Sequence, residues 1–316
     1  MQKFFAISGF AAAAACGALL WAGSATAKGT YVTFDEVYAS AVNAANTVTG
    51  AARSGSGFSG FIRTMDGTVT TFSVPGANQT LPSSINDAGA VAGGYDSGGF
   101  IRSPDGSITT FDIPNWPRAG VVSMNNTGEI TGFYNDGVDV HAFVRAADGT
   151  ITTFDGPGTP SETVPAAMND KGMITGFYGQ HGFIRAADGT ITTFDPPGAN
   201  STGPATINFD GSISGIYRDD KQIEHGFVRQ ANGTFAIFDI QECPSLYLIT
   251  GRTDKGVMSG YCLTESKHTF GFVRKPNGRI RNLNAPDSGR STSTAGMNSS
   301  GVVVGNYRNG NFLWFP

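Results

Sequence analysis

The stretch GFIRAADGTITTFDPPGANSTGPATINFDGSISG, residues 182–215, is one unit of a repeat that runs through almost the whole chain. Its first landmark is the Phe of GFIR, which stands two residues before an Arg in six units and before Trp314 in the last. This Phe is found at Phe61, Phe100, Phe143, Phe183, Phe227, Phe272 and Phe312. Successive copies are spaced 39, 43, 40, 44, 45 and 40 residues apart. A period of this size indicates a propeller or a solenoid.

Two further landmarks keep the same order in every unit. The aromatic of the TITTFD run lies at Phe34, Phe72, Phe111, Phe154, Phe194 and Phe238, with Leu283 in the seventh place. An Asn is followed seven residues later by Gly, at Asn43/Gly50, Asn86/Gly93, Asn125/Gly132, Asn169/Gly176, Asn208/Gly215 and Asn298/Gly305, with Thr253/Gly260 as the variant copy. Each landmark therefore occurs seven times, which predicts seven structural units.

Each unit reads as four short strands. GFIR and TITTFD are joined by an Asp-Gly or Asn-Gly pair such as Asp188-Gly189, which favours a two-residue hairpin turn. A two-residue turn at Asp66-Gly67 would place Phe61 opposite Phe72, and the same spacing would pair the equivalent aromatics in four other units. Two shorter strands lie on either side of the landmark Asn, whose side chain is expected to bond the backbone two residues on.

The composition agrees with an all-β, single-domain chain. Gly accounts for 44 of 316 residues and charged residues for only 15%. No long segment after residue 27 has helical periodicity. An unbroken array of similar units argues for one domain, residues 28–316, although the length alone would permit two.

The two ends of the array are complementary. Residues 28–35, KGTYVTFD, match only the fourth strand of a unit, and the last unit stops after its third. We therefore predict that Tyr31 to Phe34 pairs with Phe312 to Phe315. This closes a seven-bladed β-propeller of four-stranded antiparallel blades and leaves no incomplete blade. An open solenoid is the alternative, but it would need polar capping units at its ends.

The first 27 residues resemble a secretory signal peptide rather than part of the fold. Lys3 precedes an apolar, Ala-rich stretch from Phe4 to Trp21, and Ala25-Thr26-Ala27 is an A-x-A cleavage site. Without Lys3 the chain has 20 basic and 25 acidic residues, a net charge near −5. We expect a secreted or periplasmic protein with no nucleic-acid partner and no membrane span after cleavage.

Cys243 and Cys262 both lie in the sixth unit, one just before its first strand and the other at the end of its second. These two points are neighbours if the strands are antiparallel. In an exported protein a disulfide is the favoured interpretation. A metal site is disfavoured, because the chain has no Cys-x-x-Cys motif or partner His at ligand spacing.

The phrases GFIRAADGTITTF and AMNDKGMITGFY and their copies resemble the HAF-type extracellular repeat family of bacteria. The resemblance covers Tyr31 to Pro316. It implies a secreted β-propeller-like repeat and no established activity. The sixth unit departs most from the pattern, because Thr253 replaces Asn and the loop before it contains Cys243.

The functional signals are weaker than the fold signals. Trp116 and Arg118, in the loop after the second TFD, are candidate ligand contacts, and a Pro-rich structural loop is the competing interpretation. Asp136, Asp219 and Asp220, in longer loops between the second and third strands, are candidate ligand or calcium contacts, against ordinary solvated charge. No other cofactor and no catalytic residue is predicted, and no common catalytic motif is present.

His141, His181 and His225 occupy one place in successive units, two residues before the landmark Phe. Strands far from the axis diverge, so these histidines are interpreted as repeated structural residues rather than as ligands of one metal ion. The recurring Asp of TFD is expected to cap the turn that follows it.

Two functional hypotheses remain open. The first is a non-enzymatic binding or interaction module at or outside the cell envelope, with a carbohydrate or protein ligand. The alternative is a polysaccharide-active hydrolase or lyase. Two carboxylates, or a Tyr and His with a base, at one end of the central channel would count against the first. The sequence leaves enzymatic activity undecided and favours a binding role.

Overall fold

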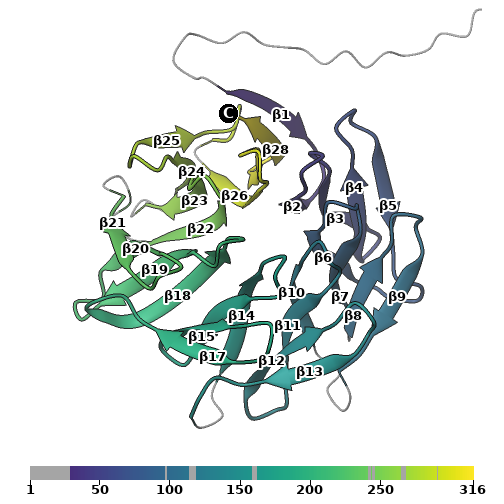
Figure 1. Cartoon of the computed structure of the whole chain (residues 1–316). Coiled ribbons are helices and arrows are strands. Elements are labelled where there is room, and N and C mark those ends of the chain that lie inside the picture. Colours follow the sequence, from purple (N-terminus) through teal and green to yellow (C-terminus); the bar gives the residue numbers. More distant parts are fainter. Residues whose placement is uncertain are drawn as a thin grey trace, which may run out of the picture.

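The computed structural model is a ring of seven antiparallel sheets around a central axis (Figure 1). It describes residues 29–96, 98–113, 119–158, 162–240, 243, 246–264, 268–289 and 291–316. Each sheet has four strands and forms one blade. In six of the blades the strands follow each other in chain order, with the first of them innermost (Figure 1). None of the described residues forms a helix long and apolar enough to cross a membrane.

The strands of blades 1 to 3, from the inner to the outer strand, are β2 (Tyr38–Val42), β3 (Val48–Ser54), β4 (Gly57–Arg63) and β5 (Val69–Phe72); β6 (Thr80–Ile85), β7 (Val91–Tyr95), β8 (Gly98–Arg102) and β9 (Ile108–Phe111); and β10 (Ala119–Met124), β11 (Ile130–Asn135), β12 (Val140–Arg145) and β13 (Ile151–Phe154). Those of blades 4 to 6 are β14 (Thr163–Met168), β15 (Ile174–Tyr178), β16 (His181–Arg185) and β17 (Ile191–Phe194); β18 (Ala199–Ile207), β19 (Ile213–Asp219), β20 (Glu224–Arg229) and β21 (Phe235–Phe238); and β22 (Leu246–Arg252), β23 (Met258–Leu263), β24 (Thr269–Arg274) and β25 (Ile280–Leu283).

Blade 7 joins the two ends of the chain. It contains β26 (Thr292–Met297), β27 (Val303–Tyr307) and β28 (Gly310–Phe315), and its outer strand is β1 (Thr30–Phe34). In Figure 1 β1 lies beside β28. The register pairs Tyr31 with Trp314 and Thr33 with Phe312. The predicted seven-bladed propeller and its closure by the N-terminal strand are therefore confirmed. β1 covers the edge of β28, which would otherwise be open to association with other strands.

The landmark Gly is required by a close backbone approach. The innermost strand of each blade has a bulge, as between Pro165 and Ala167, and the carbonyl before it turns toward the neighbouring strand. A Cβ on Gly176 would lie 2.2 Å from the carbonyl oxygen of Val164. The six equivalent glycines face a strand carbonyl in the same way, so any side chain at this place would displace the innermost strand.

The landmark Asn has two roles, of which the sequence predicted one. As expected, the Asn169 side-chain oxygen accepts hydrogen bonds from the backbone N–H of Lys171 and Met173, each at 3.0 Å. Its amide also donates to the carbonyl of Asn208 in the next blade, at 2.8 Å. The Asn298 amide donates to the carbonyl of Asn43 at 2.9 Å and so links blade 7 to blade 1. The turns nearest the axis are therefore joined from blade to blade.

The predicted Phe–Phe pairs within each hairpin are wrong by one residue. Gly182 pairs with Phe194, and Phe183 pairs with Thr193. In the turn, the N–H of Gly189, which has a positive φ, donates to the carbonyl of Ala186, and the N–H of Ala186 donates to the carbonyl of Thr190. The loop therefore contains three residues instead of the predicted two. Because one residue of slip moves a side chain to the opposite face, the two aromatics point to different neighbouring blades.

This shift makes the aromatics contact each other between blades. Phe183 packs edge-on against Phe154 of the preceding blade with ring centroids 6.0 Å apart, and Phe194 meets Phe227 of the next at 6.1 Å. The Arg185 guanidinium also lies over the Phe154 ring, at 4.9 Å. The Arg185 side chain therefore covers the preceding blade. Aromatic contacts therefore join neighbouring blades, within a core that also contains aliphatic side chains such as Met168 and Ile174.

Candidate binding site at the rim of blade 6

One rim of the ring carries the connections between second and third strands and those between successive blades. The Phe58 N–H, at the start of β4, donates to the carbonyl of Asn78 in the connection to blade 2, at 3.1 Å. The Thr202 N–H in β18 donates to the carbonyl of Gln180, between β15 and β16, at 2.9 Å. The described loop candidates, Asp136, Asp219 and Asp220, lie at the connections between second and third strands and therefore belong to this rim.

Blades 3, 4 and 5 each carry the same Tyr–His–Asp cluster at this rim. In blade 3 the Tyr134 ring stacks on His141 at 5.1 Å, and His141 Nδ1 lies 2.8 Å from an oxygen of Asp155. In blade 4 His181 Nδ1 lies 2.7 Å from Asp195. Blade 5 has the equivalent bond, at 2.7 Å, from His225 to Asp239. The structural role predicted for the three histidines agrees with this repetition.

The TFD carboxylates in these blades bond the histidines, which the expected turn-capping role did not include. The clusters resemble the Tyr/His/base arrangement that would argue for an enzyme. However, they occur in three successive blades and involve the second, third and outer strands of each, whereas the first strand of each of these blades is the innermost one. They hold the rim of each blade together.

The charge state of the blade 3 cluster depends on two carboxylates. His141 Nε2 is 3.2 Å from Asp136, while Nδ1 faces Asp155. Burial by itself would lower the pKa of His141, but the hydrogen bonds and charges of Asp155 and Asp136 outweigh it and raise the pKa above its ordinary value. The backbone N–H groups of Asp139 and Val138, together with His141, lower the pKa of Asp136.

Blade 6 replaces all three members of the cluster. The register places Cys262, Phe270 and Asn284 where blades 3 to 5 have Tyr, His and Asp. Cys262 forms the predicted disulfide with Cys243, with a Cα–Cα distance of 5.6 Å, and both residues are buried. The disulfide links the entry to blade 6 with its second strand. Cys262 has a shorter side chain than the Tyr it replaces, and Phe270 puts an apolar ring in the place of the imidazole.

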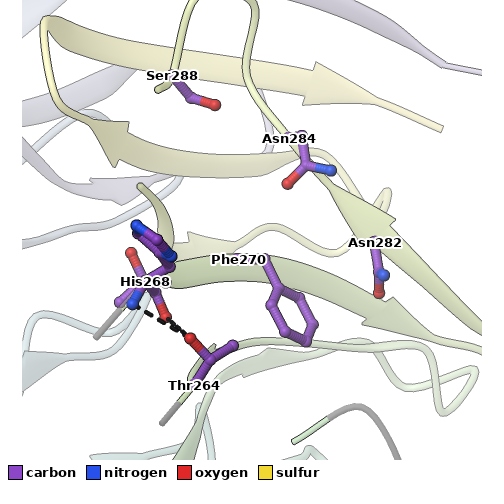
Figure 2. A pocket seen from close by; sticks show the side chains of 7 residues that line it. Thr264, His268, Phe270, Asn282, Asn284 and Ser288 are labelled. Carbon is purple, nitrogen blue, oxygen red and sulfur yellow. Dashed lines mark hydrogen bonds between the residues drawn. The ribbon is translucent and has the colours of Figure 1, made fainter. Parts of the chain in front are cut away.

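A pocket with a volume of about 490 Å³ opens at this place. Its described lining residues are Thr264, His268, Thr269, Phe270, Asn282, Asn284 and Ser288. In Figure 2 Thr264 and His268 lie on one side of the Phe270 ring, and Asn282 lies on the other side. The Thr264 hydroxyl donates to the His268 carbonyl at 3.1 Å and accepts from the His268 N–H at 3.2 Å, which shapes one wall (Figure 2).

The polar walls of this pocket are carboxamides and hydroxyls. Asn282 and Asn284 lie two residues apart along the outer strand, so their side chains emerge on the same face, and both are exposed. Neither carboxamide has a hydrogen bond to another residue in the described part of the chain. Each can donate and accept. Of the described lining residues, His268 is the one with a titratable side chain.

A second, smaller pocket of about 230 Å³ lies at the opposite end of the channel, among the innermost turns. Its carboxylates already have partners. Asp87 accepts from the Ala44 N–H at 2.9 Å and from the Asn126 amide at 3.0 Å. Asp170 accepts from the Asn126 N–H and amide at 2.8 and 3.0 Å. These carboxylates therefore serve blade-to-blade contacts.

The structure does not bring the predicted ligand contacts together at one site. Trp116 and Arg118 lie outside the described residues. Asp136 accepts hydrogen bonds from two backbone N–H groups of its own loop, and Asp219 does the same for Lys221 and Ile223. Asp220 lies in the adjoining turn of blade 5, and none of these three lines the blade 6 pocket. No group of three His, Cys, Asp or Glu side chains placed to hold a metal occurs in the part of the chain that the structure describes.

Sequence reasoning missed the residues that line the pocket. His268 is offset from the three repeated histidines, and Phe270 stands in the histidine position itself. The available signal was the divergence of the sixth unit, where Thr253 replaces Asn and two cysteines appear. That divergence could have directed attention to blade 6, although it could not identify the side chains that face a cavity.

Comparison with known proteins shows the fold class and no family. No protein-family model matches the chain, and no curated protein matches it either. The resemblance to HAF-type repeats therefore stays a prediction.

Among solved structures, virginiamycin B lyase from Staphylococcus aureus is 13% identical with a TM-score of 0.63, covering 92% of this chain and 100% of that one. Oligogalacturonate lyase from Vibrio parahaemolyticus is 10% identical with a TM-score of 0.62, covering 92% and 97%. The WD40 β-propeller domain of Doa1 is 12% identical with a TM-score of 0.57, covering 91% and 95%. At these identities the likeness shows the β-propeller fold alone.

Proposed function

We propose that this protein is an exported, non-enzymatic binding module that acts at or outside the cell envelope through the pocket of blade 6. The single observation that carries the proposal is the substitution of Cys262, Phe270 and Asn284 for the Tyr–His–Asp cluster, together with the cavity at that place. Its volume of about 490 Å³ falls in the usual range of about 300–1,000 Å³ for ligand sites.

Export is supported by the disulfide and by the leader-like start of the chain. Disulfides persist in oxidising compartments, and Cys243 and Cys262 are bonded. Residues 1–27 have the charge, apolar stretch and A-x-A end of a signal peptide. They lie outside the described residues, so cleavage after Ala27 is checked by sequencing the N-terminus of the protein recovered from the medium or periplasm.

The chemistry of the pocket favours binding over hydrolysis. Hydrolysis of a glycosidic bond usually requires two carboxyl groups flanking that bond. The described lining residues supply carboxamides, hydroxyls, one imidazole and one aromatic ring. Such groups can hold and orient a polar ligand without reacting with it.

The test uses the mature chain, residues 28–316, on a glycan array and on cell-envelope material from the cells that produce it. Asn282→Trp places a bulky ring in the pocket and should abolish binding. Thr193→Trp is the matched control, because Thr193 is exposed and occupies the same place in the outer strand of blade 4. Equal binding by wild type and Asn282→Trp would refute this site.

A polysaccharide-active enzyme is the second candidate, favoured by His268 in the pocket wall, since an imidazole can act as a general base. Two of the structures with the same fold are lyases by name, virginiamycin B lyase and oligogalacturonate lyase. Each glycan that binds is therefore incubated with the protein and analysed by mass spectrometry. Shorter products that disappear with His268→Ala would replace the binding proposal with this one.

A further inference from the structure

From the same pocket we infer the class of ligand: a neutral saccharide whose C–H face packs on Phe270 and whose hydroxyls bond Asn282 and Asn284. This inference rests on the proposed function and makes it more specific. It follows from three features of the pocket that the equivalent places in blades 3 to 5 lack.

The first feature is a flat apolar surface. The Phe270 ring is half-buried, with one part packed against the hydrophobic core of blade 6 and the rest in the pocket wall (Figure 2). In blades 3 to 5 a histidine bonded to an aspartate occupies this place. A ring held by core contacts is already oriented, so a ligand that packs on it gains apolar burial without first ordering the side chain.

The second feature is a pair of carboxamides with unused hydrogen-bonding capacity. Asn284 occupies the place of Asp155, Asp195 and Asp239, one residue beyond the Gly271–Leu283 pair, but the histidine position is taken by Phe270, whose side chain has no polar atom to offer. Asn282 lies on the same face of the strand. A hydroxyl both donates and accepts, as a carboxamide does, so adjacent sugar hydroxyls can satisfy both groups.

The third feature is the kind of charge in the walls. No Lys, Arg, Asp or Glu is among the described residues that line the pocket. Among the described lining residues the carboxylate of an acidic sugar would find no Lys or Arg side chain to pair with, and a buried charge without a partner is costly. Carboxamides, threonine hydroxyls and Ser288 instead match a ligand rich in hydroxyls. This favours a neutral sugar over an acidic one.

The experiment is calorimetric titration of the mature chain with four disaccharides. Cellobiose, maltose and chitobiose are the neutral probes, and digalacturonic acid is the acidic probe. Binding of at least one neutral probe is expected. Asn282→Ala and Asn284→Ala should each weaken it about tenfold, the loss expected for one hydrogen bond that leaves a polar group unsatisfied. Thr193→Ala, at the place of Asn282 in blade 4, should bind as the wild type does.

Phe270→Leu tests the stacking contact separately. Leucine retains apolar packing against the core but removes the flat ring, so neutral-sugar binding should fall while thermal stability changes little. Unchanged melting temperatures for Asn282→Ala and Asn284→Ala, both at exposed positions, show that any loss of binding is not a loss of folding.

Three results would overturn the inference: no binding of any neutral probe, preferential binding of digalacturonic acid, or neutral binding that the three pocket variants leave unchanged. Failure here is distinguishable from failure of the proposed function. If Asn282→Trp still abolishes binding to envelope material while the neutral probes fail, the pocket is a binding site for another class of ligand, such as a protein segment.

Discussion

Thr253 stands where six other blades have the landmark Asn, and its side chain has no amide to donate to the next blade. It keeps the local bond, because the Val257 N–H donates to its hydroxyl at 3.2 Å, and its carbonyl accepts from Asn208. Thr253→Asn should add the bond to the Asn298 carbonyl and raise the free energy of unfolding by about 0.5–1.5 kcal/mol. Urea denaturation measures the change.

The matching loss variant is Asn169→Ala, which removes the bond to Asn208 and two turn bonds. It should destabilise by about 1–3 kcal/mol, since buried groups lose their partners. A Thr253→Asn protein no more stable than the wild type would show that these blade-to-blade bonds do not limit stability.

His141 gives one rim cluster a dependence on pH. Its pKa is raised in the folded chain, so its contribution to stability is fully present below the unfolded value of about 6.5 and is lost as pH rises through the folded pKa. His141→Gln should therefore destabilise more at about pH 5 than at about pH 9. Chemical denaturation at both values gives the two differences, and equal differences would contradict the proposed bonding to Asp136 and Asp155.

At the scale of elements, the disulfide stabilises the most divergent blade. It closes a loop with a sequence separation of 19 between two buried cysteines. Replacing both by Ser should lower the free energy of unfolding by about 3 kcal/mol, because the unfolded chain regains the freedom of that loop. Reduced wild type should then unfold like the double variant, and an undiminished midpoint in reducing agent would exclude this role.

The hairpins show which part of an element the sequence could predict. The Asp-Gly signal located each turn correctly, and the landmark Phe residues do lie in the predicted strands. The register depended on whether the turn held two or three residues, and a type I turn followed by a positive-φ Gly also accepts Asp-Gly. The register decides on which face of the blade each aromatic lies, and therefore which neighbouring blade it contacts. The aromatic pairs could not be assigned from one hairpin alone.

At the scale of the whole molecule, ring closure depends on five residues at the start of the described chain. Removing residues 1–35 deletes β1 and exposes the edge of β28. We expect the truncated protein to unfold at lower temperature and to self-associate, because an unpaired edge can accept another strand. Size-exclusion chromatography with light scattering measures the association.

A synthetic peptide of residues 29–36, added in trans, should restore the monomer and part of the thermal stability. A scrambled peptide of the same composition is the control. A truncated protein that remains monomeric with the wild-type melting temperature would show that three strands are sufficient for blade 7.

The sequence by itself determined the number of blades, the four-strand unit, the closure through the N-terminal strand and the cysteine pairing. These follow from periodicity, from turn residues with special conformational needs and from two incomplete ends, all of which are local properties of the chain. The tertiary structure alone decided the aromatic contacts between blades, the second role of the landmark Asn and the pocket of blade 6. Each of these depends on which side chains from different strands and blades face one another, and the distances between them are set only when the ring is closed.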